Sequence, residues 1–163
     1  MKKILMTLCV ALITLGASAQ KGEQNVGAHV LYGTDAGNIG FGVKYQKNIT
    51  DAIRLEAVGD YYLKSDGVSM FDVDINGHYL FPLSDKITAY PLVGINYTDW
   101  KEDRYIEVTD VEFEYASVGF GLNLGGGIQY KLTDKIRIGA ELKYQTISGA
   151  STAVVGAGIT FTL

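Results

Sequence analysis

The sequence is poor in cysteine, proline and histidine, and each shortage excludes a class of structure or chemistry. Its one cysteine, Cys9, lies in an N-terminal apolar run that we expect to be removed. The mature chain then has no disulfide and no cysteine-based zinc site. Two prolines and 20 glycines indicate strands and turns, and no segment has a helical period. Acidic residues outnumber basic ones by 18 to 14, so no basic face is available for nucleic acid.

A second apolar run long enough for a transmembrane helix is also missing. The N-terminus has the features of a secretory signal: Lys2 and Lys3, an apolar run too short to span a bilayer, and an Ala-Ser-Ala sequence that ends at Ala19. We predict that residues 1–19 are a signal peptide and that residues 20–163 form one domain. Its removal takes two lysines away and changes the net charge from −4 to −6, because all 18 acidic residues remain.

Three near-copies of one strand–turn–strand sequence organise the rest of the chain. Each has an aliphatic residue, then Thr or Ser, then Asp, a spacer and Ile. Short polar side chains bond to nearby backbone groups in turns, and alternating apolar residues on both sides indicate strands. The copies are YQKNITDAIRL (45–55), YLFPLSDKITA (79–89) and IQYKLTDKIRI (128–138).

The alternation predicts eight strands, with the three short turns at one end and four longer loops at the other. This pattern indicates an all-β fold, an eight-stranded antiparallel up-and-down barrel. The predicted strands are 25–33, 39–47, 52–62, 70–81, 86–97, 116–132, 136–146 and 153–163, with loops at 34–38, 63–69, 98–115 and 147–152.

Side chains alternate across a strand, so the two faces of each strand can be read separately. One face is apolar and carries a single charge, Lys47, next to a turn; the other carries ten charges and most of the strand glycines. A soluble barrel would place the apolar face inside. The interior of a small barrel is crowded, however, and glycines fit it better than bulky residues. We therefore predict that the apolar face points outward into lipid, and that the barrel is transmembrane.

The aromatic residues of the outward face fall at two levels, as the two interfaces of a bilayer favour. One level lies near the turns and the other near the loops. The first level is Tyr45, Tyr79, Phe81, Tyr130 and Phe161, and the second is Tyr32, Phe41, Tyr61, Phe71, Tyr97 and Tyr144.

The longest loop has a strand-like sequence of its own. From Ala116 onward the even positions are apolar, whereas Glu112 and Glu114 occupy even positions just before it. This inversion predicts a β-ribbon, with its tip at Thr109-Asp110, that projects beyond the lipid between the fifth and sixth strands. A disordered loop is the alternative. One residue conflicts with the strand pattern, because Pro91 lies in mid-strand and cannot donate to the ladder; we expect a local bulge there.

The inward face has five charges of each sign, which predicts ion pairs that plug the lumen. A charge-lined conduit is the alternative, since inward glycines such as Gly42, Gly125 and Gly158 could leave water-filled space. The charged residues of this predicted lumen network are Lys44, Arg54, Lys131, Arg137 and Lys143 with Glu56, Asp60, Asp72, Asp74 and Glu141.

Metal binding and catalysis find little support in the sequence. Asp60, Asp72 and Asp74, with Asp66 in the loop between them, could gather near the outer rim, but their spacing fits no defined calcium loop, and we expect a solvated acidic rim. The two histidines are both inward and have no serine nearby on the same strand, as a hydrolase would require. We predict no metal, no cofactor and no enzymatic activity.

A signal peptide, eight alternating strands, short turns with Thr-Asp or Ser-Asp, and a chain that stops inside its last strand together resemble the small bacterial outer-membrane β-barrel family, of the OmpX and OmpA-membrane-domain kind. The resemblance covers nearly all of the mature chain and implies the outer membrane of a Gram-negative cell. Members usually end in an aromatic residue that is read by the barrel-assembly machinery, whereas this chain ends in Leu163.

These observations predict a non-enzymatic outer-membrane barrel with a structural or surface-interaction role and a largely plugged lumen. A narrow porin-like channel for small solutes or ions is the alternative. The expected partners are outer-membrane lipid, the assembly machinery, and an extracellular protein or surface at loop 98–115, and we expect a monomer. The aromatic residues predicted to make the surface contact are Trp100, Tyr105, Phe113 and Tyr115.

Overall fold

The computed structural model describes residues 21–35, 37–65, 67–106, 111–148 and 150–163. Side chains are described for these residues except 102–106, 111–116 and 150. The predicted signal peptide lies outside the described residues, and so do Asp66 and the predicted ribbon tip at Thr109-Asp110. In the described part of the chain, no helix is long and apolar enough to cross a membrane.

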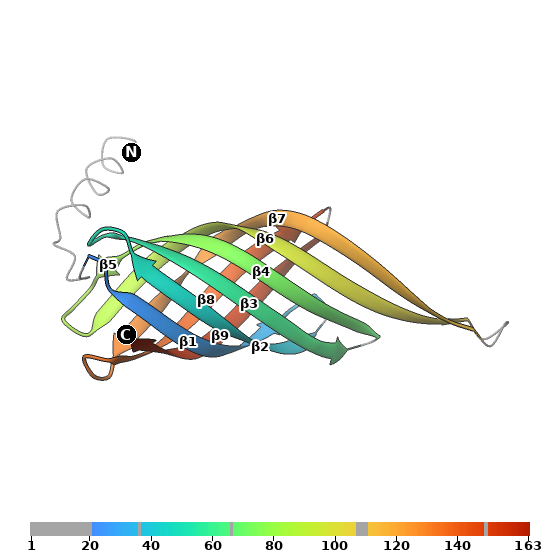
Figure 1. The fold of residues 1–163 in the computed structure, drawn as a ribbon, viewed down its shortest axis with the longest axis horizontal. Helices are drawn as coiled ribbons and strands as arrows, with labels where there is room; N and C mark the ends of the chain where they lie inside the picture. The colour runs from blue at the N-terminus through green and yellow to red at the C-terminus, as the bar shows by residue number, and fades with distance from the viewer. Residues whose placement is uncertain (1–20, 36, 66, 107–110, 149) are drawn as a thin grey trace, which may run out of the picture.

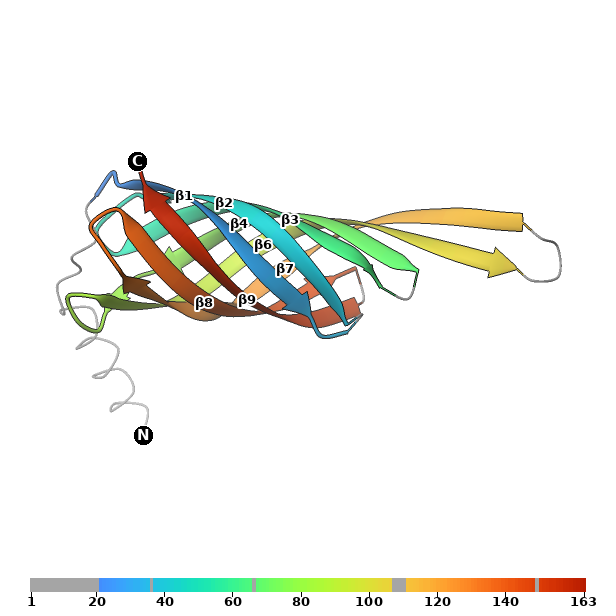
Figure 2. The same cartoon turned by 90° about the horizontal axis from the view of Figure 1, so that it is seen from below.

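The described residues form one antiparallel sheet that closes on itself (Figures 1 and 2). Strands adjacent in sequence pair with each other, except β4 and β5; β1 pairs with β9, and β4 pairs with β6 to complete the ring. The strands are β1 (Gln24–Gly33), β2 (Asn38–Asn48), β3 (Ile53–Ser65), β4 (Val68–Tyr79), β5 (Phe81–Pro82), β6 (Ile87–Ile106), β7 (Val111–Lys131), β8 (Ile136–Ile147) and β9 (Ala150–Thr162).

The ring has eight strands, as predicted, because β5 contains only two residues and bonds to β6 alone. The sequence predicts one strand over 70–81, whereas the structure separates β5 from β4. The structure also extends β3 to Ser65 and begins β4 at Val68, so the loop predicted at 63–69 is mostly strand. One register shift occurs between β3 and β4, between Tyr62 and Ser65.

Pro91 explains why β4 and β5 are separate strands. The last pair of β4 with β6 is His78↔Leu92, and the first pair of β5 with β6 is Phe81↔Ala89. From one pair to the next the chain advances by three residues, from 78 to 81, and β6 goes back by three, from 92 to 89. The register is therefore unbroken, and the bulge that we predicted is wrong. Pairing lapses opposite Pro91, which has no N–H to donate. On the other side of the strand the Leu80 N–H bonds to the Ala52 carbonyl at 2.7 Å, which continues the pairing with β3.

The three short turns share one hydrogen-bond pattern, as their repeated sequence predicts. In the first, the Ile49 N–H donates to the Ile53 carbonyl (2.8 Å) and the Ile53 N–H donates to Thr50 Oγ1 (2.9 Å). Ser84 and Thr133 accept equivalent backbone bonds in the other two turns. The Ser or Thr hydroxyl thus fixes each turn, and all three turns lie at the same end of the barrel as the C-terminus (Figure 1).

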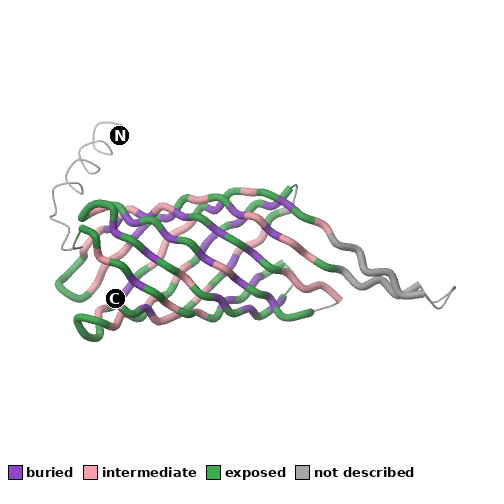
Figure 3. The backbone as a smooth tube through the Cα atoms, in the orientation of Figure 1, coloured by how far each residue is buried: buried purple, intermediate pink, exposed green. Residues whose placement is uncertain are grey.

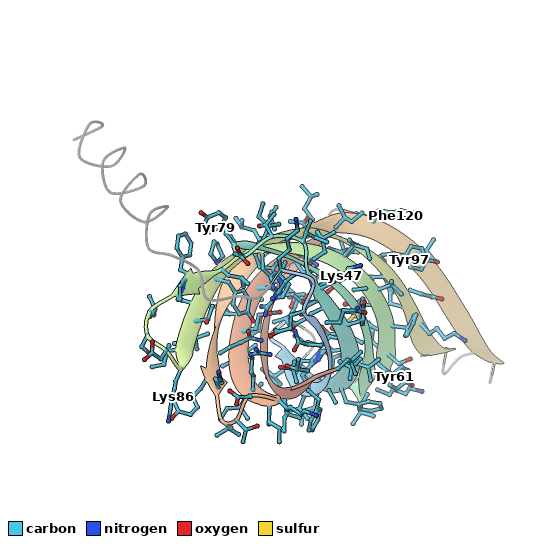
Figure 4. The ribbon with its side chains drawn as sticks, turned by 60° about the vertical axis from the view of Figure 1, so that its left-hand side comes forward. Lys47, Tyr61, Tyr79, Lys86, Tyr97 and Phe120 are labelled. Atoms are coloured by element: carbon cyan, nitrogen blue, oxygen red, sulfur yellow. The ribbon has the colours of Figure 1, made fainter. Side chains whose placement is uncertain are left out.

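The apolar face points outward, as predicted. Exposed and buried residues alternate along the strands (Figure 3), and Phe41, Val43 and Leu124 are among the most exposed large apolar residues. Side chains such as Tyr61, Tyr79 and Phe120 radiate from the barrel wall (Figure 4). Neighbouring strands hold aromatic residues side by side, with Phe41 and Tyr61 5.8 Å apart between ring centroids. This exterior suits lipid rather than water.

The predicted ribbon is also present. β6 and β7 stay paired from Ile87↔Tyr130 to Ile106↔Val111 and extend far beyond the other strands (Figures 1 and 2). β4 accompanies β6 only to Val68↔Glu102, and β8 accompanies β7 only up to Asn123↔Gln145. The disordered-loop alternative is therefore wrong for residues 98–106 and 111–115, which are strand.

Candidate functional site

The inward face of the barrel forms a polar core. Eighteen polar or charged residues of the described chain are buried, and they come from all eight strands of the ring. Amides and hydroxyls separate the charges and link one strand to the next. For example, Asn96 donates to Asn123 (2.9 Å), which in turn donates to Asn76 (3.1 Å) across the lumen.

The half of the lumen nearest the turns holds a balanced group that we call the turn-side cluster: Lys44, Arg54, Glu56, His78, Tyr90 and Glu141. Lys44 Nζ lies 3.3 Å from Glu56 Oε2 and 3.9 Å from Glu141 Oε2. The Tyr90 hydroxyl donates to Glu141 Oε2 at 2.9 Å, and its ring stacks on His78 with centroids 4.5 Å apart. The Arg54 guanidinium lies over the same Tyr90 ring, 4.8 Å from its centroid. Two cations and two carboxylates therefore neutralise each other here.

The hydrogen bonds of His78 decide which of its nitrogens carries the proton. Arg54 Nε and Nη2 lie 3.1 and 2.9 Å from His78 Nδ1. Guanidinium nitrogens only donate, so Nδ1 accepts and the neutral ring carries its proton on Nε2, which faces Glu56 Oε1 at 3.5 Å. His78 is thus fixed as a neutral link between Arg54 and Glu56.

Glu56, His78 and Glu141 offer ligand atoms within 4.8 Å of one another, the one such group of acidic or metal-ligating residues in the described chain. A histidine ligand needs a free nitrogen lone pair, however. Here Arg54 occupies Nδ1, the proton occupies Nε2, and Lys44 already lies beside both carboxylates. The donor pattern fits a hydrogen-bonded ion network rather than a metal centre.

The half of the lumen nearest the loops holds a second group, the loop-side cluster: His29, Asp60, Asp72, Asp74 and Lys143. Lys143 Nζ contacts Asp74 Oδ2 and lies 3.6 Å from Asp60 Oδ2. His29 Nε2 lies 2.7 Å from Asp60 Oδ1. The donor to Asp72 is neutral, Gln145 Nε2 at 3.0 Å. The cluster therefore holds three carboxylates and one lysine, which contacts Asp60 and Asp74.

This cluster corrects the prediction of a solvated acidic rim. Asp60, Asp72 and Asp74 are 1%, 2% and 0% exposed. They are enclosed because β3 and β4 continue beyond them to Ser65 and Val68, which moves the rim of the barrel further out than the alternation indicates.

Two residues of the predicted lumen network do not join it. Lys131 pairs with Asp134 at 2.9 Å in an exposed position at the turn end. Arg137 binds Glu23 Oε2 (2.9 Å), Asn25 Oδ1 (2.8 Å) and Thr162 Oγ1 (2.7 Å) at the same mouth. The other eight charges lie in the two clusters. The prediction of matched signs is therefore wrong for the lumen proper, where three cations face five carboxylates.

Apolar side chains lie above the loop-side cluster. Leu31, Tyr62 and Val154 are 4%, 1% and 3% exposed and pack together, with Met70 against them. We call these four residues the apolar lid.

The predicted surface contacts are placed only in part. Trp100 is half-buried rather than exposed, and a Cβ atom on Gly119 would lie 3.0 Å from its Cζ3 atom. The side chains of Tyr105, Phe113 and Tyr115 lie outside the described residues. Their backbone belongs to the paired strands of the ribbon.

The spaces inside the barrel are small or separated. A cavity of about 40 Å³ lies between the two clusters, with His29, Lys44 and Glu141 in its wall. That volume holds about one to three waters. A vestibule of about 530 Å³ opens at the turn end, and its floor includes Arg54 and Gln129. Arg54 donates to Gln129 at 2.7 Å, so this bonded pair lies between the vestibule and the inner cavity.

Most inward glycines lie close to side-chain or backbone atoms of neighbouring strands, and Gly139, Gly156 and Gly158 also line the small inner cavity. A Cβ atom on Gly127 would lie 2.5 Å from the Tyr90 hydroxyl, and one on Gly158 would lie 2.5 Å from His29 Cβ. At Gly42 a Cβ atom would collide with Asp60. Glycine is used here because neighbouring strands insert large polar side chains into the same crowded space.

Sequence reasoning identified the charges of the lumen but missed most of their neutral partners. The signal that could have found them is position, because all of these residues lie on the inward face that alternation defines. His29 and His78 were expected on the inward face, and both lie there. The missed residues are Gln46, Asn76, Tyr90, Asn96, Asn123, Gln129 and Gln145 in the lumen, and Glu23 at the mouth.

Comparison with solved structures gives the same architecture at low sequence identity. The N-terminal β-barrel domain of OprF from Pseudomonas aeruginosa is 16% identical, with a TM-score of 0.66 over 88% of this chain and 98% of that chain. OprG from the same organism is 12% identical, with a TM-score of 0.63 over 88% and 97%. Ail, the attachment invasion locus protein of Yersinia pestis, is 14% identical, with a TM-score of 0.62 over 88% and 100%.

A second structure of Ail contains the heparin analogue sucrose octasulfate; it matches at 14% identity and a TM-score of 0.61 over 88% of this chain and 100% of that chain. No curated protein sequence matches this chain. The family of the outer membrane protein beta-barrel domain matches residues 7–162. With that match over nearly its whole length, and with a lipid-facing eight-stranded barrel, the chain belongs to the outer membrane protein β-barrel domain family.

Proposed function

We propose that this protein is a structural and surface-presenting barrel whose lumen does not conduct. The observation that carries this proposal is the succession of three layers across the lumen. These are the Arg54–Gln129 pair, the two ion clusters, and the apolar lid. An ion that crossed the barrel would have to displace buried hydrogen-bonded charges and then pass Leu31 and Tyr62, both steps that cost several kcal/mol.

The test is single-channel recording of the mature chain in a planar bilayer, after a gel-mobility assay has shown that the barrel is folded. We expect no discrete conductance from the wild type. A double variant, Arg54→Ala with Tyr62→Ala, removes the floor of the vestibule and the largest residue of the lid, and is the positive control for insertion. Discrete wild-type currents that change in Glu56→Gln would instead support the narrow-pore alternative.

A second role is supported by the ribbon. Residues 111–119 of β7 have ladder partners on β6 alone within the described chain, so one backbone edge is open over nine residues. Open edges accept an added strand from another protein. Between residues 101 and 116 the sequence has six acidic and two basic residues. A sulfated polysaccharide, of the kind represented in the Ail complex, would be repelled here, so we propose a cationic protein surface as the partner.

The pairing of β6 with β7 shows how to remove the ribbon cleanly. Replacing residues 102–115 by Asn-Gly joins Lys101 to its partner Ala116 through a two-residue turn. We expect this variant to fold and to lose binding to a polylysine-coated surface, which the full-length protein binds and from which salt releases it. Sucrose octasulfate is the matched anionic probe; binding of that probe by the full-length protein would contradict the proposed charge preference.

The remaining assignments follow from the same arrangement. The family places the protein in the outer membrane; we propose that residues 1–19 direct its export and that the assembly machinery inserts it as a monomer. We propose no catalytic role, since His29 bonds to Asp60 and His78 to Arg54, and neither histidine has a serine among its hydrogen-bond partners in the described part of the chain. Deletion of residues 2–19 tests the export step. We expect the barrel to be missing from the outer-membrane fraction of the cells, as measured by immunoblotting.

A further inference from the structure

The two halves of the lumen differ in net charge. The turn-side cluster is neutral, because Lys44 and Arg54 balance Glu56 and Glu141. The loop-side cluster has Lys143 against three aspartates, an excess of two negative charges while His29 is neutral. Excess carboxylates beneath an apolar lid are strongly unfavourable unless a proton or a bound cation offsets their charge.

A row of buried oxygen atoms without a standard hydrogen bond lies on one side of this cluster. The pairing of β4 with β6 sets Asp72 directly opposite Thr98, and Asp74 directly opposite Asn96. All four side chains are at most 2% exposed. Asp72 Oδ1, Asp74 Oδ1, Asn96 Oδ1 and Thr98 Oγ1 each lack a hydrogen bond of standard length and angle, although the Thr98 hydroxyl interacts with Asp72 and the Asn123 amide with Asp74.

A fifth oxygen comes from β8. Gln145 Nε2 donates to Asp72 Oδ2, which leaves Gln145 Oε1 beside the same carboxylate and without a partner. The amide of Asn96 is fixed in the same way, because its Nδ2 donates to Asn123 Oδ1 (2.9 Å) and to the Thr146 carbonyl (3.1 Å). The hydrogen bonds of both amides therefore leave oxygen, not nitrogen, as the free atom.

We propose that Asp72 and Asp74, with Asn96, Thr98 and Gln145, form a binding site for a hard divalent cation of the calcium type. Two carboxylates and three neutral oxygens are the ligand types that Ca²⁺ prefers. One divalent ion also cancels the excess of two negative charges. Lys143 stays on the opposite side of Asp74, at Oδ2, so the lysine and the cation occupy different carboxylate oxygens.

The site is independent of conduction, and its test measures binding and stability. The full-length mature barrel is refolded from urea in EGTA or in calcium up to about 10 mM, above the range of the weakest extracellular calcium modules. Refolding gives the ion access to the site before the barrel closes. We expect one calcium per barrel after desalting, by elemental analysis, and a higher urea midpoint with calcium than with EGTA.

Thr98→Val is the decisive variant, because it keeps the shape and charge of the site and removes one oxygen. We expect calcium affinity to fall by about tenfold or more, as for other changes around metal sites. Asp72→Asn is the second variant and should abolish the calcium effect. Glu141→Gln is the matched control in the turn-side cluster and should leave it intact. A wild-type barrel with no calcium bound and no calcium-dependent midpoint would overturn the proposal, as would unchanged binding in Thr98→Val.

Discussion

The two halves of the lumen use the same strands and the same inward alternation, yet they solve the problem of buried charge differently. In the turn-side cluster each carboxylate lies beside a cation, and a stacked Tyr90 and His78 hold the charges in place. In the loop-side cluster one lysine contacts two of three aspartates, and several oxygens have no hydrogen bond of standard geometry. Matched charges neutralise each other, whereas surplus negative charge leaves room for the additional cation that we propose.

The largest expected effect is the loss of Lys143, the one lysine of the loop-side cluster. Lys143→Met leaves Asp60 and Asp74 buried without a lysine partner, and we expect a loss of about 3–5 kcal/mol of unfolding free energy. Urea unfolding followed by gel mobility measures it. Lys131→Met, which changes a lysine at the exposed mouth, is the control and should leave the urea midpoint nearly unchanged. Equal losses of unfolding free energy in the two variants would show that burial does not determine how much each ion pair contributes to stability.

Exchanging a carboxylate for an amide should have opposite effects in the two halves. Glu56→Gln weakens the bonds to Lys44 and Gln46 and should destabilise the barrel by about 1.5–3 kcal/mol. Asp72→Asn removes one of the surplus charges, so in EGTA we expect no loss or a gain of about 1 kcal/mol. Urea midpoints measured side by side at the same pH decide the comparison. If both variants lose stability, the charge imbalance has been compensated within the protein itself.

Glycine positions test how tightly the lumen is filled. Gly127→Ala would bring a Cβ atom to 2.5 Å from the Tyr90 hydroxyl, and overpacking of this kind costs about 1–3 kcal/mol. Gly59→Ala on the outer face is the control, because no atom lies within 4 Å of the position that the new methyl group would occupy. Thermal melting in detergent measures both. An unaffected Gly127→Ala would mean that the turn-side cluster has room to move.

The smallest expected effect is at the turn-end mouth of the barrel, where water screens the interaction between charges. A hydrogen bond from Lys131 and its charge lower the pKa of Asp134 in the third turn. Because that pKa is depressed on folding, the contribution of the pair is present above the ordinary carboxyl pKa and is lost as the pH falls through the lower, folded value. NMR titration of the Asp134 carboxyl should show the pKa returning toward its ordinary range in Lys131→Met. A titration that Lys131→Met does not alter would exclude the ion pair as the cause.

The sequence is sufficient to predict the architecture because each of its signals is local. Period-two alternation indicates the strands and their outward face, and the Thr-Asp and Ser-Asp repeats indicate the turns. Thr50, Ser84 and Thr133 then accept the backbone bonds that such turns require. Even the ribbon could be inferred from the change of parity before Ala116, since the backbone continues as paired strands through residues 111–115.

The lumen is predicted less well because pairing across it depends on register and on the height of the rim. Alternation places Lys131 and Lys143 on the same inward face, but only register reveals that one lies at the mouth and the other among aspartates. Likewise, the length of β3 and β4, rather than the residue types, decides that Asp60 and Asp72 are buried. Pro91 is a further example, because a proline in mid-strand is compatible both with a bulge and with a local loss of strand pairing, and the sequence does not distinguish the two.

The three short turns, which have one sequence pattern in common, also indicate the order in which the strands of the barrel can pair during folding. Each joins strands that are adjacent in sequence, whereas β1 and β9 must meet from opposite ends of the domain, as in Asn25↔Thr162. Bringing such distant segments together carries the largest loop-closure entropy, so we expect this seam to close last. Arg137 donates to Asn25 on one side of the seam and to Thr162 on the other. Arg137, one of the two charged side chains outside the lumen clusters, thus joins the first and last strands of the barrel.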